Sequence, residues 1–483
     1  MISSRLESVR SLSDDVRRCI DRGRLDNALR LIHDFVERII TEPLCTSRLA
    51  GSRTLDDLCV RIGQLTLDAL QAEGETQRRD SPSPVYAYIA TKLYRSGGHT
   101  RVIQDFIAAK PGARHVVLLT GLEGKSDLEY LRRQFDATSK VEFEQSPRRN
   151  YRECLVWLQR RLIALAPTKA FLFNHHQDSV AAAAIQPQMG LDAAFYHHGD
   201  HHLSLGVFLS HLGHIDPHAT GYHQCRGELG IDNTFIPLTF ADCGDRPPTR
   251  PFLHTGRLTT CTAARANKVE IPYFVSYLDV IPKLLKATGG RHVHIGKLSA
   301  SGLSRLRRGL AREGISPDRL LYLPWTGSVW KSLHEHEIDL YVASFPYGGG
   351  LTLVEAMGAG VPVALHNHIF SRVLSCVDLA YPEAFIWRQP EELLQRCANV
   401  TSNELQRESE LARRHYERFH SADFLQRYLN EPDAPPLTPP PASDRFSVNT
   451  EEWSLWMEQR LNCRNLLHRT AYRAFRKIRA RWL

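Results

Sequence analysis

Two successive series of short apolar segments, separated by helix-compatible stretches, most constrain the fold of this chain. The first series runs from residue 85 to residue 223 and comprises VYAYIA, HVVLLT, KAFLFN, DAAFYH and ATGYH. The second runs from 251 to 366 and comprises PFLHTG, RHVHIG, RLLYLPW, DLYVAS and VPVALH. Strands that alternate with helices favour a parallel sheet. We therefore predict an α/β protein with two Rossmann-like domains and a binding cleft at the carboxyl ends of their strands.

The segments outside these series divide the chain further. Residues 1–80 carry apolar side chains at helical spacing, and the polar, proline-containing stretch 73–84 is typical of a linker. The organisation that we predict is a helical N-terminal domain (1–80), an N-terminal Rossmann-like domain that binds the acceptor (85–248), a C-terminal Rossmann-like domain that binds the donor (249–430), a Pro-rich linker (431–450) and a basic amphipathic helix (451–483).

The positive charge is concentrated at the end of the chain. The 483 residues include 61 lysines and arginines against 53 acidic residues, and eight of the basic residues lie within 460–481. This helix could pack against the first Rossmann-like domain, lie on an anionic membrane surface or dock a partner protein. No nucleic-acid reader motif accompanies the charge, so we expect no nucleic-acid partner.

Cysteine usage indicates a reducing compartment. The ten cysteines are scattered and form no CxxC pair, which argues against a zinc module or a redox motif. The N-terminus lacks the apolar run of a secretory signal, and no stretch has the length of a transmembrane helix. We expect a cytoplasmic protein, with the basic helix as a possible peripheral contact to the inner face of the membrane.

The most informative motif is DLYVASFPYGGGLTLVEAMGAGVPVALHNHIFSRV, residues 339–373. It predicts a strand, a turn at Gly348, Gly349 and Gly350, a helix from about Leu351 to Gly358, and a second strand. Glycines let the backbone approach a ligand closely, and a helix N-terminus offers free N–H groups with a partial positive charge. The motif therefore predicts a site for a diphosphate.

Two side chains of the predicted helix suit a nucleotide. Thr352 lies in the first turn, where its hydroxyl could donate to a phosphate oxygen. Glu355 lies one turn further on, where its carboxylate could accept both hydroxyls of a ribose.

The segment FPYGGGLTLVEAMGAGVPVA resembles the donor site of O-GlcNAc-transferase-like glycosyltransferases, including the bacterial adhesin N-glucosyltransferases, with the pattern FPYNGGTTTxEALWxGVPVV. Its EAMGAGVPV portion also resembles the retaining GT-B family that carries a Glu-x7-Glu motif. Tyr347 stands where that motif has its first glutamate, which favours the first group and an inverting mechanism. The resemblance implies a GT-B fold, a nucleotide-sugar co-substrate with a UDP-sugar favoured, and no metal or other cofactor.

The resemblance extends more weakly over residues 252–400. It places Lys268 where such enzymes carry a lysine that neutralises the donor diphosphate, although a lysine that opens a helix is often only a solvated charge. Arg257 is a rival for this role, because it follows the segment predicted as the first strand of the C-terminal domain. Pro324 belongs to the stretch 321–325, which is predicted to form the wall for the base.

The N-terminal half offers a loop that could face the donor. In LYRSGGHTR, a Gly-Gly turn follows the first predicted strand and opens a helix. The resemblance implies that Gly97, Gly98 and His99 contact the sugar or the diphosphate across the cleft. The alternative is a tight strand-to-helix turn without a ligand.

Histidines cluster after the strand DAAFYH. Four histidines and an aspartate within 197–202 could bind a transition metal, but their spacing alone defines no coordination geometry. We instead expect this loop to enter the cleft and supply a general base, with His198, Asp200 and His201 as candidates. His211, His214, His218 and His223 follow, so some of these histidines are structural.

These features predict a glycosyltransferase that moves a hexosyl or N-acetylhexosaminyl group from a nucleotide sugar to a glycan, a lipid-linked or a protein acceptor. The alternatives are a retaining GT-B enzyme and a non-catalytic subunit that binds a sugar nucleotide or a glycan. The sequence does not identify the acceptor.

Overall fold

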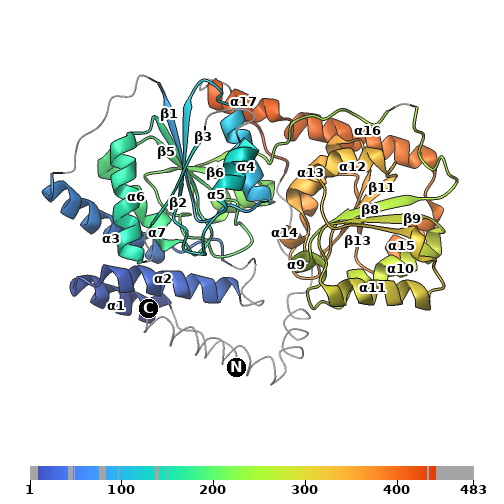
Figure 1. Ribbon diagram of the computed structural model, residues 1–483, viewed down its shortest axis with the longest axis horizontal. Coiled ribbons are helices and arrows are strands. Elements are labelled where there is room, and N and C mark those ends of the chain that lie inside the picture. Colours follow the sequence, from blue (N-terminus) through green and yellow to red (C-terminus); the bar gives the residue numbers. More distant parts are fainter. Residues whose placement is uncertain are drawn as a thin grey trace.

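The computed structural model describes residues 9–41, 47, 49–74, 83–95, 97–135, 141–147, 150–247, 249–431 and 435–441. It contains two α/β units, each built on one parallel sheet (Figure 1). The predicted basic helix at 451–483 and residues 442–450 of the linker lie outside the described residues, so their structure stays a prediction.

The first sheet has seven strands in the order β3-β2-β1-β4-β5-β6-β7, all parallel to their neighbours. They are β1 (Val85–Ala90), β2 (Arg114–Leu119), β3 (Val141–Gln145), β4 (Lys169–Phe173), β5 (Ala193–Tyr196), β6 (Gly213–Asp216) and β7 (Asn233–Phe235). The central strands are buried on both faces and read as continuous apolar runs, as expected for a covered parallel sheet.

The second sheet has six parallel strands in the order β10-β9-β8-β11-β12-β13. They are β8 (Thr259–Ala263), β9 (Arg291–Ile295), β10 (Leu320–Leu323), β11 (Leu340–Val342), β12 (Val363–His366) and β13 (Phe385–Trp387). In both sheets the order reverses next to the first strand, between β1 and β4 and between β8 and β11. Such a reversal opens a crevice at the carboxyl ends of the two strands.

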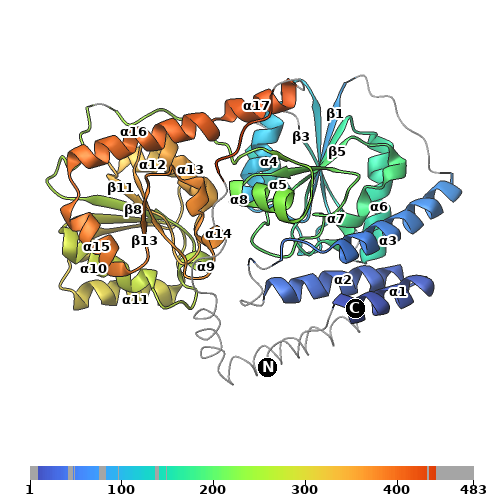
Figure 2. The same cartoon turned by 180° about the vertical axis from the view of Figure 1, so that it is seen from behind.

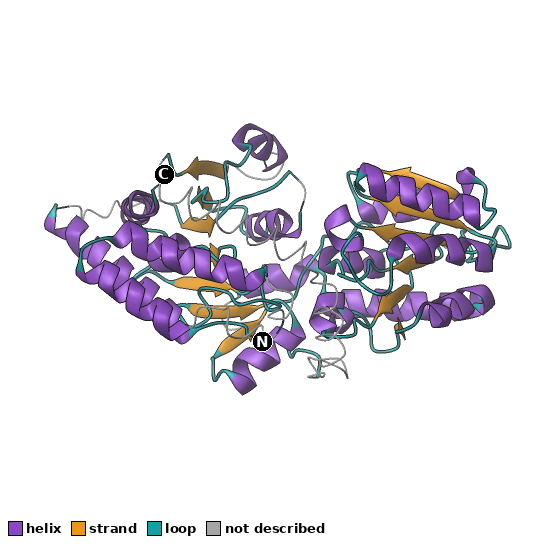
Figure 3. Cartoon of the chain, turned by 90° about the horizontal axis from the view of Figure 1, so that it is seen from below, coloured by secondary structure: helices purple, strands orange, loops and turns teal. Residues whose placement is uncertain are grey.

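Helices cover both faces of each sheet (Figure 3). In the first unit they are α4 (Gly98–Ala108), α5 (Leu128–Phe135), α6 (Tyr151–Leu165), α7 (Ser179–Ala184), α8 (Ala219–His223), the 3-10 helix Pro187–Met189 and the π-helix η4 (Gln224–Glu228). In the second they are α9 (Ala266–Val269), α10 (Tyr277–Thr288), α11 (Ala300–Arg312), α12 (Val329–Glu335), α13 (Gly350–Gly358), α14 (Arg372–Ser375), α15 (Pro390–Asn399), and the 3-10 helices Pro317–Arg319 and Val377–Leu379.

The N-terminal helices belong to the first unit. α1 (Val9–Asp21), α2 (Leu25–Ile40) and α3 (Arg53–Ala72) share one hydrophobic core with α6, α7 and strands β1, β2, β4 and β5. Asp56 of α3 accepts hydrogen bonds from the N–H groups of Gly206 and Phe208, at 2.8 and 2.9 Å. These helices thus share the core of the first unit and do not form a separate domain ending at residue 80, because their apolar faces pack against the sheet unit as well as against one another.

The chain returns to the first unit at the end of the described region (Figure 2). α16 (Ser402–Phe419) packs on α13, and α17 (Ala422–Asn430) packs on α4. The Nδ2 of Asn430 donates to the carbonyl of Ala109 at 3.0 Å. α17 was expected within the donor domain ending at 430, but its apolar face instead contacts the first unit.

Two segments predicted as strands have other structures. The run 219–223 forms α8, because a run this short has no periodicity that distinguishes strand from helix. The run 251–256 forms turns, and β8 begins only at Thr259. Four strands were not predicted: β3, β6, β7 and β13. All are short, and the sequences of β3, β6 and β7 are polar or contain glycine, so they lack the apolar run that indicates a strand.

The contact between α3 and α7 depends on Gly63. A Cβ at this position would lie 2.0 Å from the carbonyl oxygen of Ala183 and 2.1 Å from Nε2 of Gln186. We predict that Gly63→Ala lowers the free energy of unfolding by about 1–3 kcal/mol despite the better helix propensity of alanine. Urea unfolding measures this change. Gly227→Ala is the control, because no atom lies within 4 Å of its Cβ position; equal effects of the two substitutions would contradict the prediction.

Candidate functional site

The candidate site lies at the strand-order reversal of the second sheet. α9, which contains Lys268, follows β8, and the turn Gly348–Gly350 with α13 follows β11. Since β8 and β11 are parallel neighbours, their carboxyl ends bring these two segments to one edge of the sheet.

Lys268 contacts the glycine turn directly. Its Nζ donates a hydrogen bond to the carbonyl oxygen of Gly348, and its own carbonyl accepts from the N–H of Tyr347 at 3.4 Å. Burial lowers the pKa of Lys268. Two candidates separated by 80 residues thus meet, and the ammonium group lies beside the start of α13.

Glycine is required in this turn because other backbone lies against it. A Cβ on Gly348 would lie 2.5 Å from the carbonyl oxygen of Ser375, and its N–H donates to the carbonyl of Leu374 at 2.7 Å. A Cβ on Gly349 would lie 2.5 Å from Oγ1 of Thr352. The segment 374–375 therefore supports the turn from behind.

The N-terminus of α13 provides donors for an anion. Gly349 is the N-cap residue, and the N–H groups of Gly350, Leu351 and Thr352 in the first turn have no intrahelical acceptor. Together with the helix dipole and Lys268 they are groups of the kind that bind an anion. The Thr352 hydroxyl donates to the Gly349 carbonyl at 3.0 Å, so it stabilises the turn, and the backbone N–H is what this residue offers a phosphate.

Glu355 is buried between α13 and the start of α12. It is 7% exposed, and its Oε2 accepts a hydrogen bond from the N–H of Trp330 at 3.0 Å. Burial raises the pKa of Glu355 to about 7. The exposed residues Pro324 and Trp325 lie between β10 and α12, at the carboxyl edge of the sheet. The glutamate and the predicted wall for the base therefore flank the same short helix.

The first unit contributes the facing loop. Gly97 has a φ of 159°, and α4 begins at Gly98. A Cβ on Gly98 would lie 3.3 Å from Cδ1 of Leu351, so the Gly-Gly turn contacts the first turn of α13. The structure thus places this loop beside the first turn of α13. The ring of His99 stacks on His198 with centroids 4.5 Å apart.

The histidine loop, residues 197–212, connects β5 to β6, and its side chains lie in different environments. His198 is half-buried, and burial lowers its pKa to about 3, so its ring is neutral at neutral pH. Asp200 is buried and pairs with Nδ1 of His218 at 2.9 Å and Nδ1 of His201 at 3.6 Å. Burial would raise the pKa of Asp200, but the adjacent His218 and His201 hold it well below its usual range. Asp200 therefore orients histidines, and of the three predicted bases only His198 and His201 keep exposed surface.

Arg257 lies away from the site. It precedes β8, and its Nη1 donates at 3.3 Å to the carbonyl of Gly289, which precedes β9. Both positions are at the amino edge of the sheet, so the expected role of Arg257 is wrong, because the strand starts later than predicted. The arginine that follows β8 is Arg265, which is exposed next to α9. A correct strand boundary would have identified it.

Residues 198–202 do not form a metal-ligand group within the described part of the chain; a different group, which includes His197, lies behind them. None of the described helices has the length and apolar character needed to cross a membrane.

Solved structures share the architecture. A scan of protein-family models finds no match to this chain, and a search of curated proteins finds none either. The lipopolysaccharide outer core galactosyltransferase WaaB is similar with a TM-score of 0.54 at 14% identity, over 72% of this chain and 98% of that protein. A glycosyltransferase from Rickettsia africae has a TM-score of 0.55 at 12% identity, over 73% and 98%.

Alr3699/HepE from Anabaena, solved in complex with UDP and glucose, has a TM-score of 0.53 at 12% identity, over 72% of this chain and 98% of that protein. At these identities the likeness establishes the fold. The chain therefore has the GT-B fold of glycosyltransferases, in agreement with the resemblance of its glycine-rich segment.

Proposed function

We propose that this protein is a glycosyltransferase that uses a nucleotide-sugar donor. The observation that carries the proposal is the convergence of the Lys268 ammonium group, the Gly348–Gly350 turn and the N-terminus of α13 at the strand-order reversal. A fixed cation and free backbone N–H groups stabilise a diphosphate and the charge that grows on it as it leaves. We favour a UDP-sugar, since Alr3699/HepE was solved with UDP.

The acceptor enters, in this proposal, between the glycine turn and the histidine loop. His198 or His201 takes the proton from the acceptor hydroxyl or amide as its oxygen or nitrogen forms a bond to the anomeric carbon. The bond from that carbon to the diphosphate oxygen breaks, and its electron pair leaves with the nucleoside diphosphate. This single displacement inverts the anomeric configuration and requires no metal. Glu355 and the Pro324–Trp325 segment hold the ribose and the base.

The acceptor class that we propose is a glycan, a lipid-linked or a protein acceptor, and the transferred group is a hexosyl or N-acetylhexosaminyl unit. The basic segment 460–481 would bring the enzyme to an anionic membrane surface or to a partner protein, consistent with peripheral attachment in the cytoplasm.

Thermal unfolding with UDP, GDP, CDP, dTDP and ADP tests donor binding, followed by transfer assays with sugar derivatives of the nucleotide that binds. A ligand at about 100 times its Kd adds about 2.7 kcal/mol to the stability of the folded state. We expect a shift with UDP and release of UDP from a UDP-sugar. Stabilisation without turnover on any acceptor would identify a non-catalytic binder, and retention of the anomeric configuration would exclude the single displacement.

Lys268 and Arg257 provide a matched pair for the diphosphate contact. We predict that Lys268→Ala raises the Kd for UDP about 10- to 100-fold, because it removes a charged hydrogen-bond donor from the turn. Arg257→Ala, at the opposite edge of the sheet, should leave the Kd unchanged. Isothermal titration calorimetry measures both. Equal losses in the two variants would place the diphosphate elsewhere.

The burial of Glu355 predicts a pH-dependent cost in stability. The pKa of Glu355 is about 7 in the folded state and 4.5 in its ordinary environment, so as the pH rises the unfolded state loses this proton first. The free energy of unfolding therefore falls as the pH rises from 4.5 through 7. Glu355→Gln should therefore be more stable than the natural protein at pH 8, by up to about 3 kcal/mol, and similar at pH 4.5. Denaturant unfolding across this range measures the difference. The exposed Glu410→Gln is the control, and a pH-independent difference for Glu355→Gln would refute the prediction.

The histidine loop should contribute to turnover and not to donor binding. We predict that alanine at His198 or at His201 lowers kcat about 100- to 10,000-fold for whichever residue is the base, with the Kd for UDP retained. His211→Ala is the control, since its ring bonds to the carbonyl of Ile185 on the far side of the loop. Full turnover in both single variants would show that neither histidine is the general base.

A further inference from the structure

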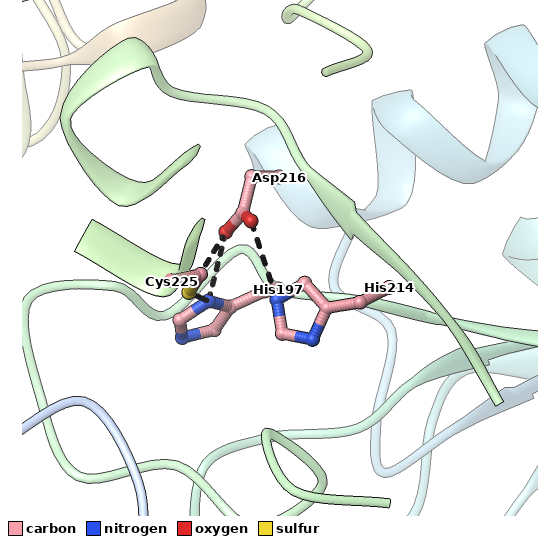
Figure 4. Close-up of side chains that lie close together, drawn as sticks. All are labelled: His197, His214, Asp216 and Cys225. Atoms are coloured by element: carbon pink, nitrogen blue, oxygen red, sulfur yellow. Dashed lines mark hydrogen bonds and ion pairs between the residues drawn. The ribbon is translucent and has the colours of Figure 1, made fainter. Parts of the chain in front are cut away.

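Four side chains with metal-ligand chemistry converge behind the histidine loop (Figure 4). His197 follows β5, His214 and Asp216 belong to β6, and Cys225 lies in the π-helix η4. Their candidate ligand atoms all lie within 4.8 Å of one another. The cluster thus joins three separate segments of the first unit.

The cluster is closed to solvent. His197, Asp216 and Cys225 are each 0% exposed, and His214 is 5% exposed. Nδ1 of His197 lies 2.9 Å from Oδ1 of Asp216, and Sγ of Cys225 lies 3.5 Å from that nitrogen and 3.6 Å from that oxygen. The carboxylate is also held from outside, since Nδ2 of Asn233 donates to its Oδ2 at 2.6 Å.

Two buried nitrogens of the cluster residues, Nε2 of His197 and Nε2 of His214, make no hydrogen bond with a described residue. Nε2 of His214 lies 3.3 Å from Oδ2 of Asp216 but makes no hydrogen bond with any described residue. A buried polar nitrogen without a hydrogen-bond partner is unfavourable, so Nε2 of His214 calls for an occupant. The nitrogen faces the other three ligands (Figure 4), where a cation would satisfy it.

The donor set matches zinc. Two imidazoles, a thiolate and a carboxylate provide four donors of the kinds that Zn²⁺ binds, and tetrahedral bonds of about 2.0–2.3 Å place ligand atoms about 3.3–3.8 Å apart. Sγ of Cys225 lies 3.5 Å from Nδ1 of His197 and 3.6 Å from Oδ1 of Asp216, and Nε2 of His214 lies 3.3 Å from the other carboxylate oxygen, all within this range. The shorter separation of 2.9 Å, between Nδ1 of His197 and Oδ1 of Asp216, is the hydrogen bond that the ion would replace.

Charge balance points the same way. The carboxylate of Asp216 and the thiolate of Cys225 would together cancel the two positive charges of the ion, which leaves a neutral buried centre. Asn233 would then act as the outer partner that orients the carboxylate.

We propose that His197, His214, Asp216 and Cys225 bind one structural Zn²⁺. The ion accepts a lone pair from Nδ1 of His197, from Nε2 of His214, from the Asp216 carboxylate and from Cys225, whose thiol proton is released to solvent on binding. It ties the start of the histidine loop to β6 and to η4. This inference does not depend on the proposed transferase activity. The four protein ligands fill all four coordination positions of the ion, so no position remains for a substrate.

Zinc content of the full-length chain tests the site. The protein is produced in zinc-containing medium, desalted into metal-free buffer and analysed by mass spectrometry of the metal. We expect about one zinc per chain in the natural protein and in Cys154→Ser, and less than about a tenth in Cys225→Ser. Cys154 is the matched control, because it is equally buried and its Sγ donates to the carbonyl of Thr120, as a serine could.

A cobalt titration decides the outcome even if Cys225→Ser does not fold. The natural protein is stripped with a chelator and titrated with Co²⁺, which should give the strong visible bands of a tetrahedral site and a thiolate-to-cobalt charge-transfer band. Cys154→Ser should retain that band. A Co²⁺ spectrum without a thiolate band, or a natural protein that contains no more zinc than Cys225→Ser, would overturn the proposal.

Discussion

The donor segment depends on the absence of side chains at the glycine turn. The backbone of 374–375 lies so close behind Gly348 that a Cβ would collide with a carbonyl oxygen at 2.5 Å. This close approach lets the Lys268 ammonium reach the turn from the other side. The result is a helix N-terminus whose free N–H groups lie beside a fixed cation, which is the arrangement on which the proposed diphosphate site rests.

Contacts of several kinds join the two units. Gly98 contacts Leu351, and Thr220 donates a hydrogen bond to Asp378, which also pairs with Arg372 at 3.6 Å. α16 and α17 carry the chain back from the second sheet to the first (Figure 1). Apolar side chains of both units belong to one continuous core cluster. Motions that separate the two units must therefore break the hydrogen bond between Thr220 and Asp378.

The histidine loop has two sides with different chemistry. His198 and His201 keep partly exposed rings, whereas His197 points back into a closed cluster with Asp216 and Cys225. The loop is also held by Asp56 of α3 through two backbone hydrogen bonds. The N-terminal helices thus have a structural role in the first unit, because Asp56 of α3 holds the histidine loop in place.

The sequence by itself determined the fold class, the two sheet units and the glycine turn before a helix. Apolar runs at strand length and glycines before a helix are local patterns. They can be recognised in the sequence without knowing which residues they contact. The same reasoning failed for Arg257, because one misplaced strand boundary moves a residue from one edge of a sheet to the other. Only the tertiary structure showed that Lys268 reaches Gly348 and that Asp200 is buried against His218. It also brought His197, His214, Asp216 and Cys225 together, since their spacing along the chain follows no zinc motif and they meet only through the parallel pairing of β5 and β6 and the position of η4.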